Sequence, residues 1–279
     1  MLALSAQAFA AEPFGQGVLW QVEKDGVQPS YLFGTIHVSD SRVTKLPKLV
    51  GEALNQSKSF TMEMVANETA QTYFVQAMSL PPEKDLRAML GDELYSKAIA
   101  LMQEQGFPPE ATNQFKPWAI LLTLIVPKPT GEPILDERLK ETAAAQKKPV
   151  YQLESVEEQV AVFDGMPLAT QIAMLNSAAA YHEELPRFVE QTIEAYLARD
   201  LSALWELNTL YADEAEAEKH YDYFVERVLF SRNVRMAERA KERLSEGGAF
   251  IAVGALHLYG EKGVLALLQK QGYKVTRVY

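Results

Sequence analysis

Two of the chain's four histidines share a local sequence pattern that could place them in one site. His37 ends the run 31–37 (YLFGTIH), and His257 ends the run 251–257 (IAVGALH). Each run is an apolar segment typical of a buried strand, followed by Gly-x-x-His. In α/β sheets the catalytic groups lie at the carboxyl ends of the strands, where a glycine lets the backbone turn sharply or approach another group closely. We therefore expect the two imidazoles to meet in one crevice.

Carboxylates follow two further strand-like runs. Glu63 follows the run 59–62 (SFTM), and Glu154 follows the run 150–153 (VYQL). The sequence has no cysteine, so two imidazoles in one crevice suggest a metal ion whose usual third ligand is a carboxylate. We expect Glu63 to be that ligand, with a structural ion pair as the alternative interpretation. Glu154 is a second candidate, although an acidic residue at this position would also favour the N-terminus of the next helix.

A site built from His37, His257 and Glu63 would leave coordination positions open for water. A divalent ion there would lower the pKa of that water and supply hydroxide near neutral pH, with Glu154 or Glu63 moving the proton. Imidazole and carboxylate ligands suit Mn, Co, Zn or Fe(II), and the sequence does not choose among them.

A helical stretch further along the chain carries the pair Arg232-Asn233. The arginine could position a substrate carboxylate or carbonyl, and a structural salt bridge is the competing interpretation. The two remaining histidines, His182 and His220, lie in polar helical stretches. We expect both of them to face solvent.

Strand-like runs recur along the chain and must position these residues. They are 18–22, 31–33, 59–64, 149–153, 249–253 and 274–279. The Asp25-Gly26 pair predicts a hairpin, and the wholly apolar run 249–253 is typical of a strand buried on both faces of a sheet. Helical periodicity dominates the ranges of about 65–145 and 167–245. These patterns predict an α/β fold with a central mixed sheet, helices around it and large helical insertions in those two ranges.

The N-terminal segment differs from the rest of the sequence. The run 1–11 (MLALSAQAFAA) carries no charged side chain, and Ala8-Phe9-Ala10 fits the small-x-small pattern before a signal-peptidase cleavage site. We therefore predict that 1–10 are the remnant of a signal peptide and that 11–279 form one domain with the helical insertions. Such a protein would be periplasmic or secreted from a bacterium. The longest apolar run, 118–127, is too short to span a bilayer, so we expect no integral membrane segment.

Composition and charge exclude several classes of function. The 279 residues are 48% hydrophobic and 23% charged, which is close to the average of globular proteins. With 27 Lys and Arg against 37 Asp and Glu, the formal net charge is −10. An acidic chain without a basic block is a poor partner for nucleic acid. Disulfides, iron–sulfur clusters and thiol nucleophiles are excluded because they need cysteine.

An ordered set of motifs along most of the chain resembles the TraB/GumN family, to which the Tiki metalloproteases belong. In chain order the motifs are 18–20 (VLW), 32–38 (LFGTIHV), Glu63 after a short strand, 116–119 (KPWA), 153–155 (LES) with Glu158-Gln159, Arg232-Asn233, 254–257 (GALH) and 260–264 (GEKGV). The resemblance implies an α/β fold of the Tiki/TraB type. In the Tiki branch it implies a divalent-metal peptidase that uses two Gly-x-x-His motifs and a glutamate, which would make His37, His257 and Glu63 the metal-site residues here.

Three functions are compatible with these observations. The first is an exported metal-dependent hydrolase, a peptidase acting on a peptide or small-molecule substrate that Arg232 and Asn233 position. The second is a non-catalytic protein that sequesters a peptide or another small ligand in the same crevice. The third is a structural pair of histidines in an α/β scaffold that holds no metal.

Overall fold

The computed structural model describes residues 12–209 and 215–279. The predicted signal-peptide remnant at 1–10 lies outside the described residues, so export stays a prediction. No helix in the described ranges is both long enough and apolar enough to cross a membrane.

A six-stranded mixed sheet forms the centre of the fold, which confirms the predicted α/β class. Its strand order is β4-β3-β5-β2-β1-β6. The pairs from β4 to β2 are parallel, whereas β1 pairs antiparallel with both β2 and β6. The strands are β1 Leu19–Glu23, β2 Ser30–Thr35, β3 Ser59–Met62, β4 Val150–Gln152, β5 Ala249–Gly254 and β6 Lys274–Arg277. All six coincide with the strand-like runs of the sequence.

Strand β5 lies in the interior of the sheet because its side chains are apolar on both faces. Every residue from 249 to 253 is at most 1% exposed. On one side β5 pairs with β3, and on the other it pairs with β2 in a register that places Thr35 opposite Gly254. Since these three strands are parallel, the residues that follow them emerge at the same edge of the sheet.

Helices surround and extend the sheet. They are α1 Ser41–Thr44, α2 Lys48–Gln56, α3 Glu68–Met78, α4 Leu86–Leu90, α5 Asp92–Glu104, α6 Pro109–Thr112, α7 Pro117–Leu124, α8 Leu135–Ala145, α9 Val156–Asp164, α10 Leu168–Ala180, α11 Leu185–Leu197, α12 Leu201–Thr209, α13 Ala215–Val225, α14 Ser231–Glu246 and α15 Val264–Lys270. Short 3-10 turns lie at His182–Glu184 and Ala255–His257, and a π-helical turn at Glu226–Phe230 joins α13 to α14. The two predicted insertion ranges therefore fall between β3 and β4 and between β4 and β5.

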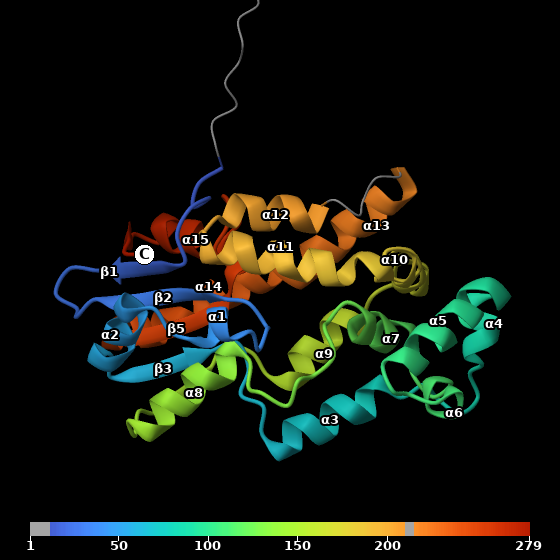
Figure 1. Ribbon diagram of the computed structural model, residues 1–279. Coiled ribbons are helices and arrows are strands. Elements are labelled where there is room, and N and C mark those ends of the chain that lie inside the picture. The colour runs from blue at the N-terminus through green and yellow to red at the C-terminus, as the bar shows by residue number, and fades with distance from the viewer. Residues whose placement is uncertain (1–11, 210–214) are drawn as a thin grey trace, which may run out of the picture.

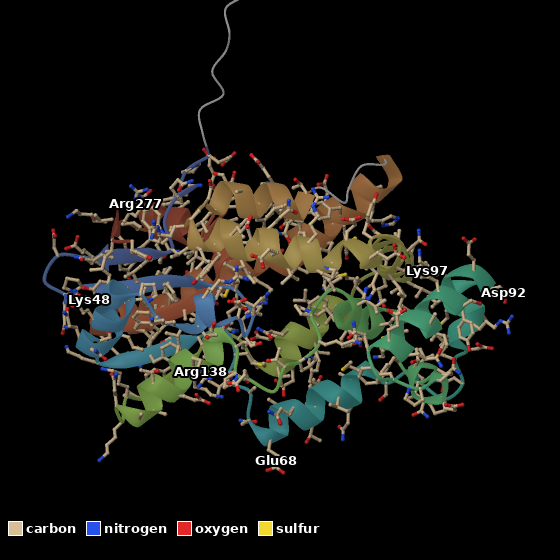
Figure 2. The ribbon with its side chains drawn as sticks, in the orientation of Figure 1. Lys48, Glu68, Asp92, Lys97, Arg138 and Arg277 are labelled. Atoms are coloured by element: carbon tan, nitrogen blue, oxygen red, sulfur yellow. The ribbon has the colours of Figure 1, made fainter. Side chains whose placement is uncertain are left out.

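The helices fall into a group that packs on the sheet and a group that extends away from it. Helix α8 contacts β3 and β4, α14 contacts β5, and α15 contacts β6. Figure 1 shows the strands gathered at one end of the molecule, with α3 to α7 extending toward the other end. Charged side chains such as Glu68 and Asp92 project outward from this helical part (Figure 2).

Each group has its own hydrophobic core. The main core surrounds the sheet and includes Phe33, Phe60 and Phe250, all at most 1% exposed. A second core lies among α4, α5, α7 and α10 and includes Met102 and Ile120. The functional side chains follow the strands and therefore lie where the sheet meets the helical part.

Candidate functional site

The two Gly-x-x-His segments lie side by side at the edge of the sheet. In each of them the glycine lies so close to its neighbours that a Cβ atom would make tight contacts. A Cβ atom on Gly34 would lie 3.0 Å from the Cα atom of Ala255, and one on Gly254 would lie 3.3 Å from Oε1 of Glu63 and 3.4 Å from Cδ2 of His257. The glycines thus bring the strand ends and the imidazole-bearing turns into direct contact.

One cavity of about 310 Å³ opens at this edge of the sheet. Four of the residues singled out from the sequence line it, and they are His37, Glu63, Arg232 and His257. The expected meeting of the two histidines in one crevice is therefore observed. Asn233 and Glu154 lie behind this lining, where they contact His257 and Arg232 respectively.

Asn233 sets the orientation and tautomer of the His257 ring. The Asn233 amide nitrogen donates to the carbonyl of Lys262 at 2.9 Å, so its oxygen faces the ring. Nδ1 of His257 lies 2.5 Å from that oxygen and must be the donor. The lone pair of Nε2 therefore accepts from Nη1–H of Arg232 at 3.4 Å, and Nε2 lies 3.5 Å from Oε1 of Glu63.

Burial keeps His257 neutral and Arg232 helps to keep Glu63 ionised. Burial lowers the pKa of His257 to about 4, although the charge of Glu63 acts in the opposite direction. Burial raises the pKa of Glu63, but the His257 ring when it is protonated, the charges of Arg232 and His37, and the hydrogen bond from Gly254 outweigh this effect and lower that pKa to about 2. A neutral imidazole and an ionised carboxylate are the states in which these groups bind a metal.

The Glu63 carboxylate is held at both oxygens. Oε1 accepts the backbone N–H of Gly254 at 2.6 Å, and Oε2 accepts Nη2–H of Arg232 at 2.6 Å. The ion pair that we considered as an alternative role for Glu63 is therefore present. The ion pair uses Oε2 only. The other oxygen, Oε1, lies 3.5 Å from Nε2 of His257.

Glu154 holds the guanidinium of Arg232 from behind. Oε2 of Glu154 accepts from Nε and Nη2 of Arg232 at 2.9 and 2.6 Å, and Oε1 accepts from Nη2 of Arg235 at 2.6 Å. The Glu154 side chain is 0% exposed. Of the two carboxylates that we considered for moving a proton, Glu63 lines the cavity and Glu154 lies behind Arg232.

Asp136 is a part of the site that the sequence did not reveal. It stands in the first turn of α8, 7% exposed, where Oδ1 accepts the hydroxyl of Thr35 at 2.7 Å. Its Oδ2 lies 3.0 Å from Nδ1 of His37. The one signal in the sequence was that Asp136 directly follows Leu135, an apolar residue of a helical pattern. This signal does not indicate that Asp136 contacts His37. Each imidazole therefore contacts an oxygen acceptor at Nδ1, an arrangement typical of metal-binding histidines.

We expect His37 to be protonated at neutral pH in the metal-free protein. The charge of Asp136 outweighs burial and raises the pKa of His37 from 6.5 to about 9. Solvent screens this pair because 59% of the His37 side chain is exposed, which weakens its contribution to stability. Because the pKa of His37 is higher in the folded protein than in the unfolded chain, the His37–Asp136 pair stabilises the fold fully below pH 6.5. This stabilisation is lost as the pH rises toward 9.

An NMR titration of the His37 ring in the presence of a chelator measures this pKa. The variant Asp136→Asn should move the midpoint back toward the ordinary value, and His257 serves as an internal control because its ring should stay neutral from pH 5 upward. An unchanged His37 midpoint in Asp136→Asn would show that Asp136 does not hold the ring.

The fold and the site together define an α/β protein with two histidines and a carboxylate around one cavity at the carboxyl edge of its sheet. A profile of the TraB/PrgY/gumN family matches residues 18–277, and the chain belongs to this family. The resemblance seen in the motifs is thereby confirmed.

Curated relatives cover most of this chain. Metalloprotease TIKI1 of Xenopus tropicalis is 28% identical over 312 residues, covering 92% of this chain and 60% of that protein. Metalloprotease TIKI1 of Homo sapiens is also 28% identical, with 92% and 61% covered. YbaP of Escherichia coli K12 is 26% identical over 245 residues, with 86% and 87% covered. The chain thus spans about 60% of the length of these TIKI1 proteins. No solved structure matches the chain significantly.

Proposed function

We propose that the chain is a metal-dependent hydrolase of the peptidase type, with His37, Glu63 and His257 as the residues that hold a divalent ion. One observation carries this proposal: two imidazoles, each contacting an oxygen acceptor at Nδ1, line the same cavity as an ionised glutamate. The similarity to the TIKI metalloproteases supports the same class of activity.

The geometry around His257 and Glu63 fits a metal ion. Two ligands bound to one ion at about 2.1 Å with a tetrahedral angle between them lie about 3.4 Å apart. The observed distance between Nε2 of His257 and Oε1 of Glu63 is 3.5 Å. Across the described ranges no group of three His, Asp or Glu side chains is assembled closely enough to hold an ion as it stands. The half-exposed ring of His37 is therefore the ligand that must approach the other two.

A divalent ion held by these residues would lower the pKa of a bound water and would polarise a substrate carbonyl. The protein's own groups have separate roles. Asn233 and Asp136 hold the two rings by Nδ1, and the ionised carboxylate of Glu63 can take a proton inside the cavity. Arg232 lines the cavity as a fixed positive charge that can bind a carbonyl oxygen or carboxylate of the substrate. Glu154 keeps that guanidinium in place.

A cleavage assay tests the proposal. Purified protein is treated with a chelator, incubated with a peptide library, and supplied with Mn, Co or Zn in turn, and the products are identified by mass spectrometry. We expect no cleavage without metal and cleavage at defined bonds with at least one of the three ions. Cleavage that persists in both His37→Ala and His257→Ala would identify a contaminating peptidase. Retention of peptides without turnover under every metal would contradict the proposal and favour a sequestering protein.

A further inference from the structure

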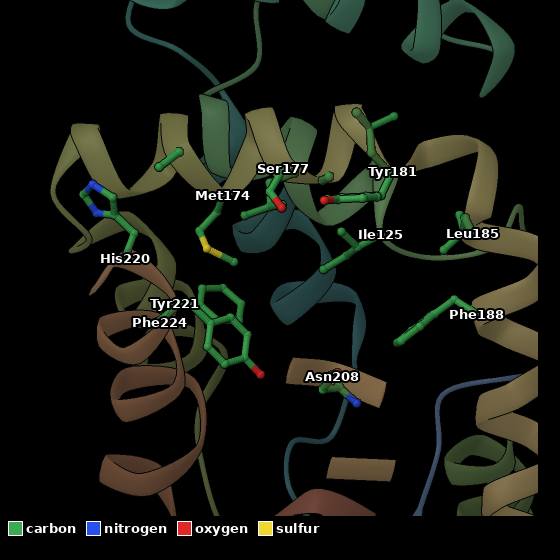
Figure 3. A pocket seen from close by; sticks show the side chains of 14 residues that line it. Ile125, Met174, Ser177, Tyr181, Leu185, Phe188, Asn208, His220, Tyr221 and Phe224 are labelled. Atoms are coloured by element: carbon green, nitrogen blue, oxygen red, sulfur yellow. The ribbon is translucent and has the colours of Figure 1, made fainter. Parts of the chain in front are cut away.

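A second cavity, of about 220 Å³, lies in the helical part between α7, α10, α11 and α13. Apolar side chains make up most of its lining, among them Leu121, Leu124, Met174, Phe188 and Phe224. Figure 3 shows Met174 and Phe188 approaching the space from different helices. None of the lining residues that the structure describes is Asp, Glu, Lys or Arg. The cavity is therefore suited to an uncharged, apolar group.

One face of α10 forms a wall of this cavity. Ala173, Met174, Ser177 and Ala178 line it at intervals that repeat every helical turn, and Tyr181, directly after the helix, lines it too. The two alanines leave the space that a larger side chain would fill. We therefore expect a larger side chain in place of either alanine to reduce the volume of the cavity.

The apolar cavity adjoins the candidate metal site. Ile125, Phe188 and Asn208 line both cavities, so the two spaces share one wall. Ile125 is 39% exposed and the next residue, Val126, which lines the metal-site cavity, is 47% exposed. The second cavity is therefore a direct neighbour of the site at which His37 and His257 would hold a substrate.

The position of His220 differs from the solvent-facing one predicted from the sequence. Its side chain is half-buried at the apolar cavity, and Nδ1 lies 3.0 Å from the hydroxyl of Thr170, which is 3% exposed. The prediction was wrong because α13 packs against α10, so that the polar sequence around His220 faces another helix. The Thr170 hydroxyl therefore pairs with Nδ1 of the His220 ring.

We propose that the apolar cavity is the specificity pocket of the enzyme and binds an aromatic or long aliphatic side chain of the peptide whose cleaved bond lies at the metal site. The inference rests on the proposed peptidase function for the source of that side chain. A dry apolar cavity of about 150 Å³ is large enough to bind benzene, so a cavity of 220 Å³ accepts a phenylalanine ring. The pocket selects for this group because burying it removes apolar surface from water, whereas a charged side chain would lose its hydration there.

Binding of N-acetyl-4-fluorophenylalanine amide, followed by fluorine NMR, tests the pocket without requiring hydrolysis. We expect the probe to bind the wild type, to show contacts with the Met174 methyl group, and to bind about tenfold more weakly to Ala178→Leu. Ala180→Leu is the matched control, because Ala180 is an exposed residue of the same helix. Its affinity for the probe should equal that of the wild type.

Several outcomes would overturn the pocket. One is equal affinity of Ala178→Leu and wild type, and another is contact of the bound probe with residues outside the apolar cavity. A third is wild-type affinity no greater for the probe than for N-acetylalanine amide, a result that does not depend on whether the variant folds. Probe binding that Ala178→Leu abolishes, in a protein that cleaves no peptide with any metal, would support the pocket and contradict the peptidase function. Cleavage without preference for phenylalanine over alanine at any position would support the peptidase function and contradict the pocket.

Discussion

Replacing Arg232 with methionine is expected to lower the free energy of unfolding by about 3 to 5 kcal/mol. The guanidinium is paired with Glu63 and Glu154, whose side chains are 13% and 0% exposed. Methionine keeps much of the arginine's volume but removes the charge, so Glu63 loses one hydrogen bond at Oε2 and Glu154 loses two at Oε2. The large cost arises because both carboxylates would stay buried without this guanidinium, which would leave Glu154 with Arg235 and Glu63 with the backbone N–H of Gly254.

Urea unfolding followed by circular dichroism measures this loss. Arg138→Met is the matched control, since Arg138 is 42% exposed and pairs with the exposed side chains of Glu132 and Glu141. The control should change the free energy of unfolding by less than about 1 kcal/mol. A loss in Arg232→Met no larger than that of the control would show that the buried ion pairs do not stabilise the site.

Glu63→Gln is expected to lower the rate of metal-dependent peptide cleavage by a factor of about 10² to 10⁴, the usual contribution of a group that moves a proton. Glutamine keeps the shape of the side chain and an oxygen that can accept from Gly254. It removes the negative charge that faces His257 and Arg232, and with it the ability to bind an ion strongly or to accept a proton.

The initial rate of cleavage of one peptide from the library, at saturating metal, measures this effect. Glu141→Gln removes one negative charge from the surface, where Glu141 is 57% exposed, and should leave the rate unchanged. A Glu63→Gln variant that retains more than about a tenth of the wild-type rate would exclude a central role of this carboxylate in the reaction.

The sheet was predictable from the sequence because its strands carry strong local signals. The apolar run 249–253 indicates a strand buried on both faces, and Asp25-Gly26 indicates the hairpin between β1 and β2, where Gly26 has a φ of 78°. The meeting of His37 and His257 was also predictable, because both follow Gly-x-x-His after parallel strands. The Gly-x-x-His pattern places both histidines at the carboxyl edge of the sheet, whatever the arrangement of the helices.

The contacts made through helices were not predictable from local patterns. Asp136 reaches His37 from a helix about 100 residues further along the chain, and the helical periodicity of its segment does not specify this partner. Asn233 and Arg232 follow a π-helical turn at Glu226–Phe230, a rare distortion that frequently occurs at functional sites. The apolar cavity depends on the packing of α7, α10, α11 and α13, which becomes visible only when the helices are placed together.

Metal binding by the purified protein directly measures whether the two strand-end histidines, His37 and His257, share one ion. Chelator-treated protein is dialysed against Mn, Co or Zn, and the bound metal is counted by elemental analysis for the wild type, His37→Ala and His257→Ala, with His182→Ala as a control outside the site. We expect about one ion per chain in the wild type and the control for at least one metal, and a loss of most of that metal in each of the two site variants. Equal metal content in His37→Ala, His257→Ala and the wild type would show that the two histidines do not share an ion.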